Sequence, residues 1–376
     1  MKNKPSYTFT FTTVRNTILS FIIGMVFIFI ITGFIATNAY SSSMNNVSSN
    51  ISGELLTYVL AFENSYFGQA LPEQFEPPST LTLGFELATN IKPDDIRTLI
   101  GNEIPGLSTF NTRIIVAGEG TDITNMPIES PPALEVLMEE REASMIDLEE
   151  LEKLKPKETV QEKGNQQVFI HHTHSWESFL PHLPGVKNPD RATHNEMNIT
   201  LVGERLGEEL EASGIPTIVD KTDMTSKLHS RNMKSVQSYR LSREIVEEAI
   251  TENDDIMFIF DLHRDSLRKD KTTVTINGEK YARILFVIGQ SHENYELNEK
   301  FAKELHSKLE KKYPGLSRGV FGKDKTTGNG VYNQDLADSS ILIEFGGVDN
   351  SLEENYRATA AFAEVFSEVY WEQQQD

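Results

Sequence analysis

An uncharged apolar run near the N-terminus places the strongest limit on how this chain can fold. Residues 17–37 read TILSFIIGMVFIFIITGFIAT and contain no charged side chain. About 20 such residues can cross the hydrocarbon core of a bilayer as a helix, because a helix satisfies its backbone hydrogen bonds within one segment. The run therefore predicts a single transmembrane anchor. A cleaved signal peptide is the alternative, although the run is long for one and Thr37-Asn38-Ala39 is a poor cleavage site.

Basic residues are unevenly placed around this run. Lys2, Lys4 and Arg15 precede it, and the next basic residue along the chain is Lys92. Since short flanking segments rich in Lys and Arg stay in the cytoplasm, residues 1–16 are predicted to form a cytoplasmic tail. Everything beyond the anchor is then predicted to lie outside the cytoplasm.

Shifts in composition divide the remainder of the chain into four predicted regions. Residues 38–52 are rich in Ser and Asn, which predicts a flexible tether. Residues 53–125 contain short apolar segments separated by prolines, which indicates a small membrane-proximal α+β region without evident chemistry. Residues 126–164 are rich in Glu and Lys and predict an acidic helical linker with a solvated helix. Residues 165–376 have the pattern of a larger folded domain.

The composition excludes several classes of function. A formal net charge of −21 argues against nucleic-acid binding, which needs clustered Lys and Arg to neutralise phosphates. The chain has no cysteine, so disulfide frameworks, thiolate zinc sites and cysteine nucleophiles are excluded. Any metal must therefore be bound by His, Asp or Glu, and all nine histidines lie between His171 and His306.

Strand and helix patterns alternate within residues 165–376. Residues 168–170 form a short apolar run, and the nearly all-apolar IMFIFDL at residues 256–262 predicts a strand covered on both faces. Helical patterns follow the strands, as in residues 236–250, and ILIE at residues 341–344 predicts a last strand before a closing helix. This alternation is typical of an α/β fold with a mainly parallel sheet flanked by helices.

Chemically active side chains gather at three predicted strand ends. They are HHTHSWE at residues 171–177, DLHRD at residues 261–265 and IEFGG at residues 343–347. The carboxyl ends of parallel strands meet at one edge of a sheet, where α/β enzymes place their active sites. His and carboxylate side chains bind zinc, and a catalytic zinc keeps one position for water. A further carboxylate must take the proton of that water and pass it to the leaving group, and Glu344 is placed for this task.

The motifs HTHSWESF, DLHRDS and GVYNQDLADSSILIEFGGVDN resemble the signatures of the stage II sporulation protein P family. The resemblance covers residues 165–370 and implies a fold similar to zinc amidases and carboxypeptidases. It implies a membrane-anchored, zinc-dependent peptidoglycan hydrolase that acts as an N-acetylmuramoyl-L-alanine amidase, with added endopeptidase activity on stem-peptide cross-links. It also implies cell wall degradation in the septal or intermembrane space during sporulation engulfment, with the sporulation proteins D and M as partners.

The resemblance assigns roles to individual residues of this chain. His174 and His263 match the zinc histidines of the family, and Glu344 matches its catalytic glutamate. The third zinc ligand stays open between two residues. Glu177 forms a His-x-x-Glu pair with His174, as in zinc carboxypeptidases, whereas Glu196 stands before a predicted helix, as the ligand does in the wider amidase family.

Four further residues are predicted to bind substrate or to support the ligands: His172, Arg264, Asn333 and Gln334. The planar guanidinium of Arg264 suits a carboxylate of the stem peptide, and a structural pair with Asp261 or Asp265 is the alternative. Asn333 and Gln334 come just before the last strand, where they contact substrate or stabilise a turn.

The predicted function is a zinc-dependent amidase of the cell wall. Two other functions stay open from the sequence. One is a zinc carboxypeptidase or endopeptidase that acts on peptide bonds only, which would leave a new peptide amine in place of a free lactyl group. The other is a catalytically inactive scaffold that binds the wall.

Overall fold

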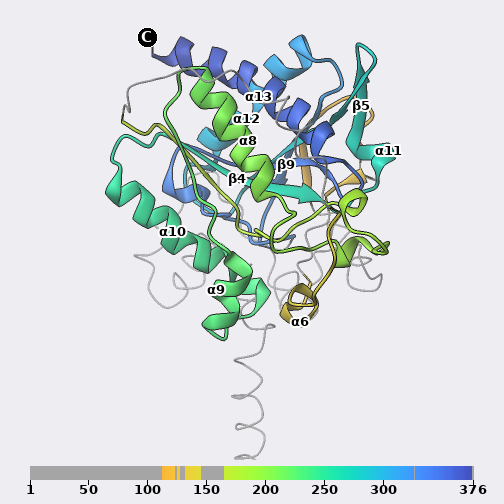
Figure 1. Cartoon of the computed structure of the whole chain (residues 1–376). Coiled ribbons are helices and arrows are strands. Elements are labelled where there is room, and N and C mark those ends of the chain that lie inside the picture. Colours follow the sequence, from red (N-terminus) through yellow and green to blue (C-terminus); the bar gives the residue numbers. More distant parts are fainter. Residues whose placement is uncertain (1–111, 123–124, 128–131, 145–164, 326, 375–376) are drawn as a thin grey trace, which may run out of the picture. The chain divides into compact units, whose positions relative to one another are not determined.

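The computed structural model describes five ranges of the chain (Figure 1): residues 112–122, 125–127, 132–144, 165–325 and 327–374. These ranges lie within Ile100–Asp376, the second of two compact units into which the chain divides. The predicted cytoplasmic tail, transmembrane anchor and flexible tether lie outside the described residues, as do most of the membrane-proximal region and part of the linker. Among the described residues, no helix is both long enough and apolar enough to cross a bilayer.

The central sheet of the described region has seven strands: β1 (Arg113–Ala117), β2 (Val168–His171), β3 (Thr217–Val219), β4 (Phe258–Asp265), β7 (Ile284–Gly289), β8 (Ser317–Lys323) and β9 (Ser339–Gly347). Their order across the sheet is β1-β8-β7-β9-β4-β2-β3. The strands β3, β2, β4 and β9 are parallel to one another. β7 is antiparallel to β9, β8 is parallel to β7, and the edge strand β1 is antiparallel to β8. The sheet is thus mixed, and its parallel part contains the three predicted strand ends.

Helices cover both faces of this sheet (Figure 1). The helices α8 (Thr200–Ala212), α12 (Tyr295–Lys312) and α13 (Leu352–Gln373) pack on one face. The helices α9 (Met224–Ser230) and α10 (Ser238–Glu252) pack on the other. The shorter elements are α6 (Leu134–Leu137), α11 (Lys269–Thr272), the hairpin of β5 (Thr273–Ile276) with β6 (Glu279–Ala282), and the 3-10 turns η4 (Leu180–His182), η5 (Pro189–Arg191), η6 (Ser235–Gln237) and η7 (Gln334–Leu336). The predicted α/β fold with helices on a sheet is confirmed.

The apolar runs of β2 and β4 follow from burial on both faces. Ile170 and Phe260 belong to the core on the side of α8 and α13, whereas Phe169 and Ile259 belong to the core on the side of α9 and α10. Successive side chains of a strand point to opposite faces, so a doubly covered strand needs apolar residues at every position. Each such side chain stabilises the fold by roughly 1.5–3 kcal/mol when it is fully buried.

Two segments before residue 165 pack on this domain. β1, from the region predicted to be membrane-proximal, pairs with β8 at the edge of the sheet. Residues 132–144, from the region predicted to be a solvated helical linker, form only the one-turn helix α6 and then an extended stretch. The reason is tertiary: Leu137 is buried and Ala143 packs against the core, so the segment follows the domain surface and does not continue as a helix.

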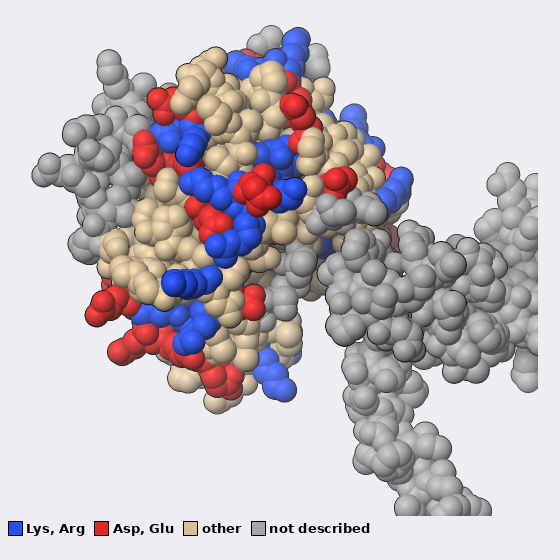
Figure 2. All heavy atoms as spheres, turned by 90° about the vertical axis from the view of Figure 1, so that its right-hand side faces the viewer, with Lys and Arg blue, Asp and Glu red and all other residues tan. Residues whose placement is uncertain are grey.

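The surface of the described domain carries both signs of charge despite the acidic composition. Figure 2 shows Lys and Arg side chains lying among Asp and Glu side chains on one face. Several pairs are close, such as Arg357 with Glu353 at 2.7 Å between Nη1 and Oε1.

Candidate metal centre

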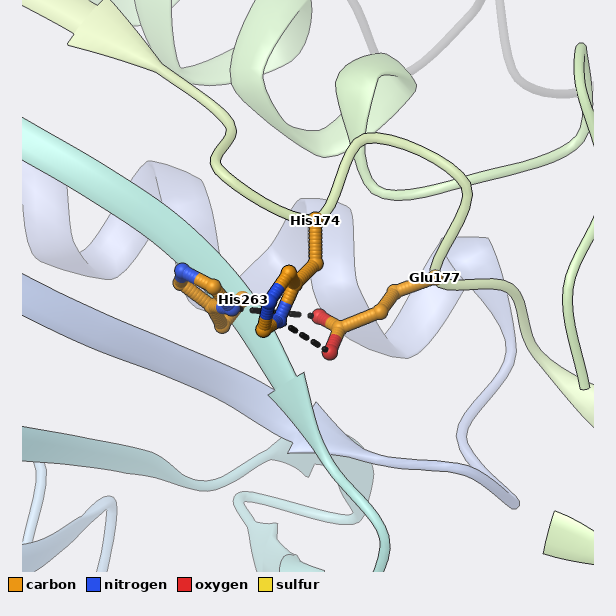
Figure 3. Close-up of side chains that lie close together, drawn as sticks. All are labelled: His174, Glu177 and His263. Atoms are coloured by element: carbon orange, nitrogen blue, oxygen red, sulfur yellow. Dashed lines mark ion pairs between the residues drawn. The ribbon is translucent and has the colours of Figure 1, made fainter. Parts of the chain in front are cut away.

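Three of the predicted site residues meet at one point (Figure 3). His174 and Glu177 come from the loop that follows β2, and His263 comes from β4. Nδ1 of His174 lies 3.5 Å from Oε1 of Glu177, and Nδ1 of His263 lies 3.4 Å from Oε2 of Glu177. One ligand atom from each residue lies within 4.8 Å of the others. This spacing allows all three side chains to bind one ion.

A tight loop places Glu177 beside His174. The backbone N–H of Glu177 donates to the carbonyl of His174 at 3.0 Å, which closes a turn. The backbone of Glu177 also forms an isolated bridge with Thr193, and its carbonyl accepts from the N–H of Ile199 at 2.7 Å. On the side of β4, the N–H of Arg264 donates to Oε2 of Glu177 at 3.0 Å. Both the backbone and the carboxylate of Glu177 are therefore fixed.

The sheet register brings the second histidine next to the predicted catalytic glutamate. His263 of β4 and Glu344 of β9 are paired positions on neighbouring parallel strands. Paired residues point to the same face of a sheet, so both side chains reach the same edge. This pairing follows directly from the apolar runs that set the register of the two strands.

The electrostatics around His263 favour a positive charge at this place. Burial lowers the pKa of His263, but Asp261 and Glu177 raise it well above its ordinary value. Burial likewise raises the pKa of Glu177, whereas His263 and hydrogen bonds with both histidines bring it below its usual range. Two histidines and one carboxylate that together favour a cation fit zinc, which takes N and O ligands and needs one open position for catalysis.

Glu344 has the properties of a proton-transfer group. Burial, and then the neighbouring Asp265 carboxylate, raise the pKa of Glu344 to about 8. Its Oε2 atom is buried and has no hydrogen-bond partner. A carboxyl group with a pKa near the working pH can both accept and donate a proton during a reaction.

One pocket contains all of these groups together with residues from several other elements. His174, Glu177, His263 and Glu344 line it. Further lining residues come from α9 and from the 132–144 segment: Thr225, Leu228, Pro132 and Leu137. The pocket thus combines ionisable groups with an apolar surface.

Two predicted residues lie apart from this group. Glu196 is exposed, and its backbone N–H donates to Nδ1 of His194 at 3.0 Å. His172 is buried, and its Nδ1 atom lies 3.1 Å from the carbonyl oxygen of Asp220. Burial lowers the pKa of His172 to about 3, and its ring packs against Gly203 of α8. Of the two candidate glutamates, the structure brings Glu177 to the histidines.

The other predicted substrate-binding residues make contacts within the protein. Arg264 donates from Nε to the carbonyl of Ser178 at 2.9 Å and from Nη2 to the carbonyl of Ala192 at 3.0 Å. Gln334 uses both ends of its side chain on the backbone of β7, and Asn333 donates to the Tyr239 carbonyl of α10 at 3.1 Å. These contacts hold the loops around the pocket in place.

The structure adds Asp261, which the sequence suggested only as a partner of Arg264. Oδ1 of Asp261 lies 3.1 Å from Nε2 of His263. Burial raises the pKa of Asp261, but His171, His263 and Thr173 bring it below its usual range. The sequence contained a signal for the contact between Asp261 and His263, because residues 261 and 263 of a strand point to the same face.

Comparison with known proteins identifies relatives of this chain. The family model for stage II sporulation protein P (SpoIIP) matches residues 94–367. The stage II sporulation protein P of Bacillus subtilis (strain 168) is 44% identical over 367 residues, which cover 94% of this chain and 91% of that protein.

Two solved structures are more distantly similar. One is the CwlD amidase from Clostridioides difficile in complex with the GerS lipoprotein, 17% identical, with 56% of this chain and 100% of that chain covered and a TM-score of 0.36. The other is a metallo-carboxypeptidase from Burkholderia cenocepacia, 10% identical, with 56% and 58% covered and a TM-score of 0.33. Similarities at this level carry no argument about function.

Proposed function

The chain belongs to the stage II sporulation protein P family, and from this premise we propose that it is a peptidoglycan hydrolase. Its proposed reaction is zinc-dependent hydrolysis of the amide bond between N-acetylmuramic acid and the L-alanine of the stem peptide. Cleavage of stem-peptide cross-links is proposed as a second activity of the same site.

One observation carries this proposal: the cluster of His174, Glu177 and His263 shares a pocket with Glu344. Three protein ligands leave a fourth position of a tetrahedral zinc for water or substrate. A buried carboxyl group that is not one of the three ligands lies on the neighbouring strand. This is the set of groups that hydrolysis of an unactivated amide requires.

The residues of the chain have distinct tasks in the proposed reaction. The chemistry that a bound zinc supplies is polarisation of the scissile carbonyl and of a water molecule. Glu344 accepts a proton from the attacking water and then donates it to the nitrogen of the L-alanine as the C–N bond breaks. The muramic acid keeps a lactyl carboxyl group that contains the oxygen of water and gives its proton to the released amine, so the products are a carboxylate and an ammonium group, and Glu344 returns to its starting state.

The proposed location follows from the N-terminal sequence and from the family. We propose that residues 17–37 anchor the chain in the cell membrane as a single span, with residues 1–16 in the cytoplasm. The folded domain would then work outside the cytoplasm, in the septal or intermembrane space during engulfment. The sporulation proteins D and M are its proposed partners.

The experiment that tests the reaction is product analysis by mass spectrometry after digestion of purified sacculi with the purified chain. The amidase predicts muramic acid with a free lactyl carboxylate and stem peptides that begin with L-alanine. New amines within the cross-links, without these products, would indicate a peptidase only. A zinc-loaded protein that releases nothing would contradict the proposal and favour a wall-binding scaffold.

A further inference from the structure

Asp261 contacts His263 at the ring nitrogen that Glu177 does not face. Nδ1 of His263 lies 3.4 Å from Oε2 of Glu177, and Nε2 lies 3.1 Å from Oδ1 of Asp261. The second distance is within hydrogen-bond range, and Nε2 has no other hydrogen-bond partner among the described residues. The two nitrogens of His263 thus have separate neighbours.

Thr173 holds Asp261 through both carboxylate oxygens. The backbone N–H of Thr173 donates to Oδ1 at 2.9 Å, and its hydroxyl donates to Oδ2 at 2.6 Å. Thr173 is fully buried and directly precedes His174 in the chain. The loop that presents one metal-ligand candidate therefore also fixes the carboxylate behind the other.

Two more residues continue this network away from the site. The hydroxyl oxygens of Thr173 and Ser242 lie 2.9 Å apart and share a hydrogen bond, and the Ser242 hydroxyl also lies 3.3 Å from the carbonyl of Tyr239. The Ser242 oxygen in turn accepts from Nδ2 of Asn333 at 2.9 Å. Both hydrogen bonds between Thr173 and Asp261 are donated to the carboxylate, so Asp261 is an acceptor and can also accept a proton held on Nε2 of His263.

His171 is the other histidine near Asp261, and its position excludes it as a competing partner. Its Nδ1 atom lies 3.7 Å from Oδ1 of Asp261, which is beyond hydrogen-bond reach. Since Thr173 holds both oxygens of Asp261, the carboxylate cannot turn toward His171 without losing those hydrogen bonds.

We propose that Asp261 is a positioning residue that keeps the proton of His263 on Nε2 and so leaves Nδ1 free to bind the metal. Thr173 fixes Asp261, and Ser242 and Asn333 support Thr173. A carboxylate that accepts from the second nitrogen of a ligating histidine sets its tautomer and orientation and strengthens metal binding. The inference rests on the proposed metal centre, but it concerns affinity for the ion and not the bond that is cleaved.

The test is the zinc dissociation constant of the full chain, measured by competition with a chromophoric chelator. Asp261→Asn keeps the shape of the side chain and is expected to weaken zinc binding by about 10–100-fold. Thr173→Val removes the hydroxyl but keeps the backbone hydrogen bond, so a smaller loss is expected. Ser242→Ala, one step further away, should have the smallest effect.

A matched control separates positioning from general destabilisation. Asn298 is buried and donates to the carbonyls of Ala337 and Ser340, at the opposite end of β9 from Glu344. Asn298→Ala should lower the unfolding temperature without changing the zinc dissociation constant. In the zinc-loaded protein, ¹⁵N spectra of labelled histidines should show His263 with Nδ1 bound and Nε2 protonated.

The outcomes distinguish this inference from the proposed function. Zinc affinity of Asp261→Asn within twofold of the unmodified chain, or an equal loss in Asn298→Ala, would overturn the positioning role. Coordination through Nε2 of His263 would also overturn it. If the unmodified chain does not bind zinc, the proposed metal centre itself fails. If Asp261→Asn does not fold, the zinc affinity of Thr173→Val provides the test.

Discussion

Two parts of the pocket are built in different ways. His263 and Glu344 stand at paired positions on neighbouring strands, so the hydrogen bonds of the sheet fix their separation. Pro132 and Leu137 belong to the 132–144 segment, which has one helical turn and no sheet partner within its described residues. The first part is held by main-chain pairing, and the second by a few side-chain contacts.

Arg141 provides several of the hydrogen bonds that hold the 132–144 segment. Its Nη1 atom donates to Oγ1 of Thr193 at 2.8 Å, and Nη2 donates to the carbonyl of Val136 at 2.6 Å. The carbonyl of Arg141 lies 3.1 Å from Nε2 of His194. Because Thr193 also bridges to Glu177, the segment and the ligand loop share an anchor.

The sheet-held part and the segment-held part of the pocket suit different tasks. Groups fixed by the sheet suit chemistry, since catalysis requires reacting groups to be held in a defined geometry. An apolar wall held by side chains suits contact with substrate, which tolerates small displacements. Changes in the sheet-held part should therefore abolish the reaction or metal binding, and changes in the segment should alter substrate affinity.

The largest expected effect is that of Glu344→Gln. Loss of the proton-transfer group should lower the rate of wall hydrolysis by about 10²–10⁴-fold, while zinc content stays the same because Glu344 is not one of the three ligands. Release of stem peptides and metal analysis of the same sample measure both. Glu196→Gln, an exposed change, serves as the control and should keep full activity. A Glu344→Gln protein with normal activity would remove this residue from the mechanism.

The next effect concerns the ligands. Glu177→Ala removes one of three protein ligands, so the loss of zinc affinity should exceed the roughly 10–100-fold typical of residues behind the ligands. Glu196→Ala should bind zinc normally, because Glu196 is exposed and lies outside the cluster. Equilibrium dialysis followed by metal analysis measures both variants. If Glu196→Ala lost zinc affinity and Glu177→Ala did not, Glu196 would be the third ligand and the cluster of His174, Glu177 and His263 would not be the metal site.

These residues also show which parts of the site could be predicted from the sequence. The meeting of His174, His263 and Glu344 was predictable because each lies in or just after an apolar strand, near carboxyl ends that share an edge of the sheet, whereas their separate roles came from the family resemblance. The choice between Glu177 and Glu196 was not predictable, because it depends on the turn at His174 and the bridge to Thr193. Such contacts join residues through loop conformation, which leaves no periodic signal.

The described part of the predicted linker, residues 132–144, differs from a solvated helix for a related reason. Its four Glu residues are typical of a solvated helix, and only the tertiary contacts of Leu137, Ala143 and Arg141 show otherwise. Thr193 and His194, which contact Arg141, lie 52 and 53 positions away in the chain. Side-chain contacts over that separation cannot be inferred from one sequence.

A smaller effect is expected for Leu137→Ala. The variant removes apolar surface from the pocket, which should cost about 1 kcal/mol of substrate contact and raise KM about fivefold, with little change in kcat or zinc content. A soluble disaccharide-peptide substrate allows both constants to be measured. Met138→Ala is the matched control, since Met138 is adjacent but 37% exposed. An increase in activity would instead mean that the segment obstructs the pocket.

The smallest effect is a pH dependence at the point where the segment meets the domain. The carbonyl of His182 accepts from the N–H of Ser144 at 2.8 Å, and its Nε2 atom accepts from the N–H of Leu352 at 2.9 Å, at the start of α13. Burial lowers the pKa of His182 to about 4 from an ordinary 6.5. A proton on Nε2 would remove this acceptor and place a positive charge at the positive end of a helix.

The sign follows from which state binds the proton. Between pH 6.5 and 4 the unfolded chain binds a proton at residue 182 that the folded chain does not, so the free energy of unfolding falls as the pH is lowered. The loss from this one group is on the order of 1–3 kcal/mol across the window. Urea unfolding at pH 7 and at pH 4.5 measures it for the unmodified chain and for His182→Gln, which should lose less stability over the same interval. Equal losses in the two proteins would show that protonation of His182 does not cause the loss of stability at low pH.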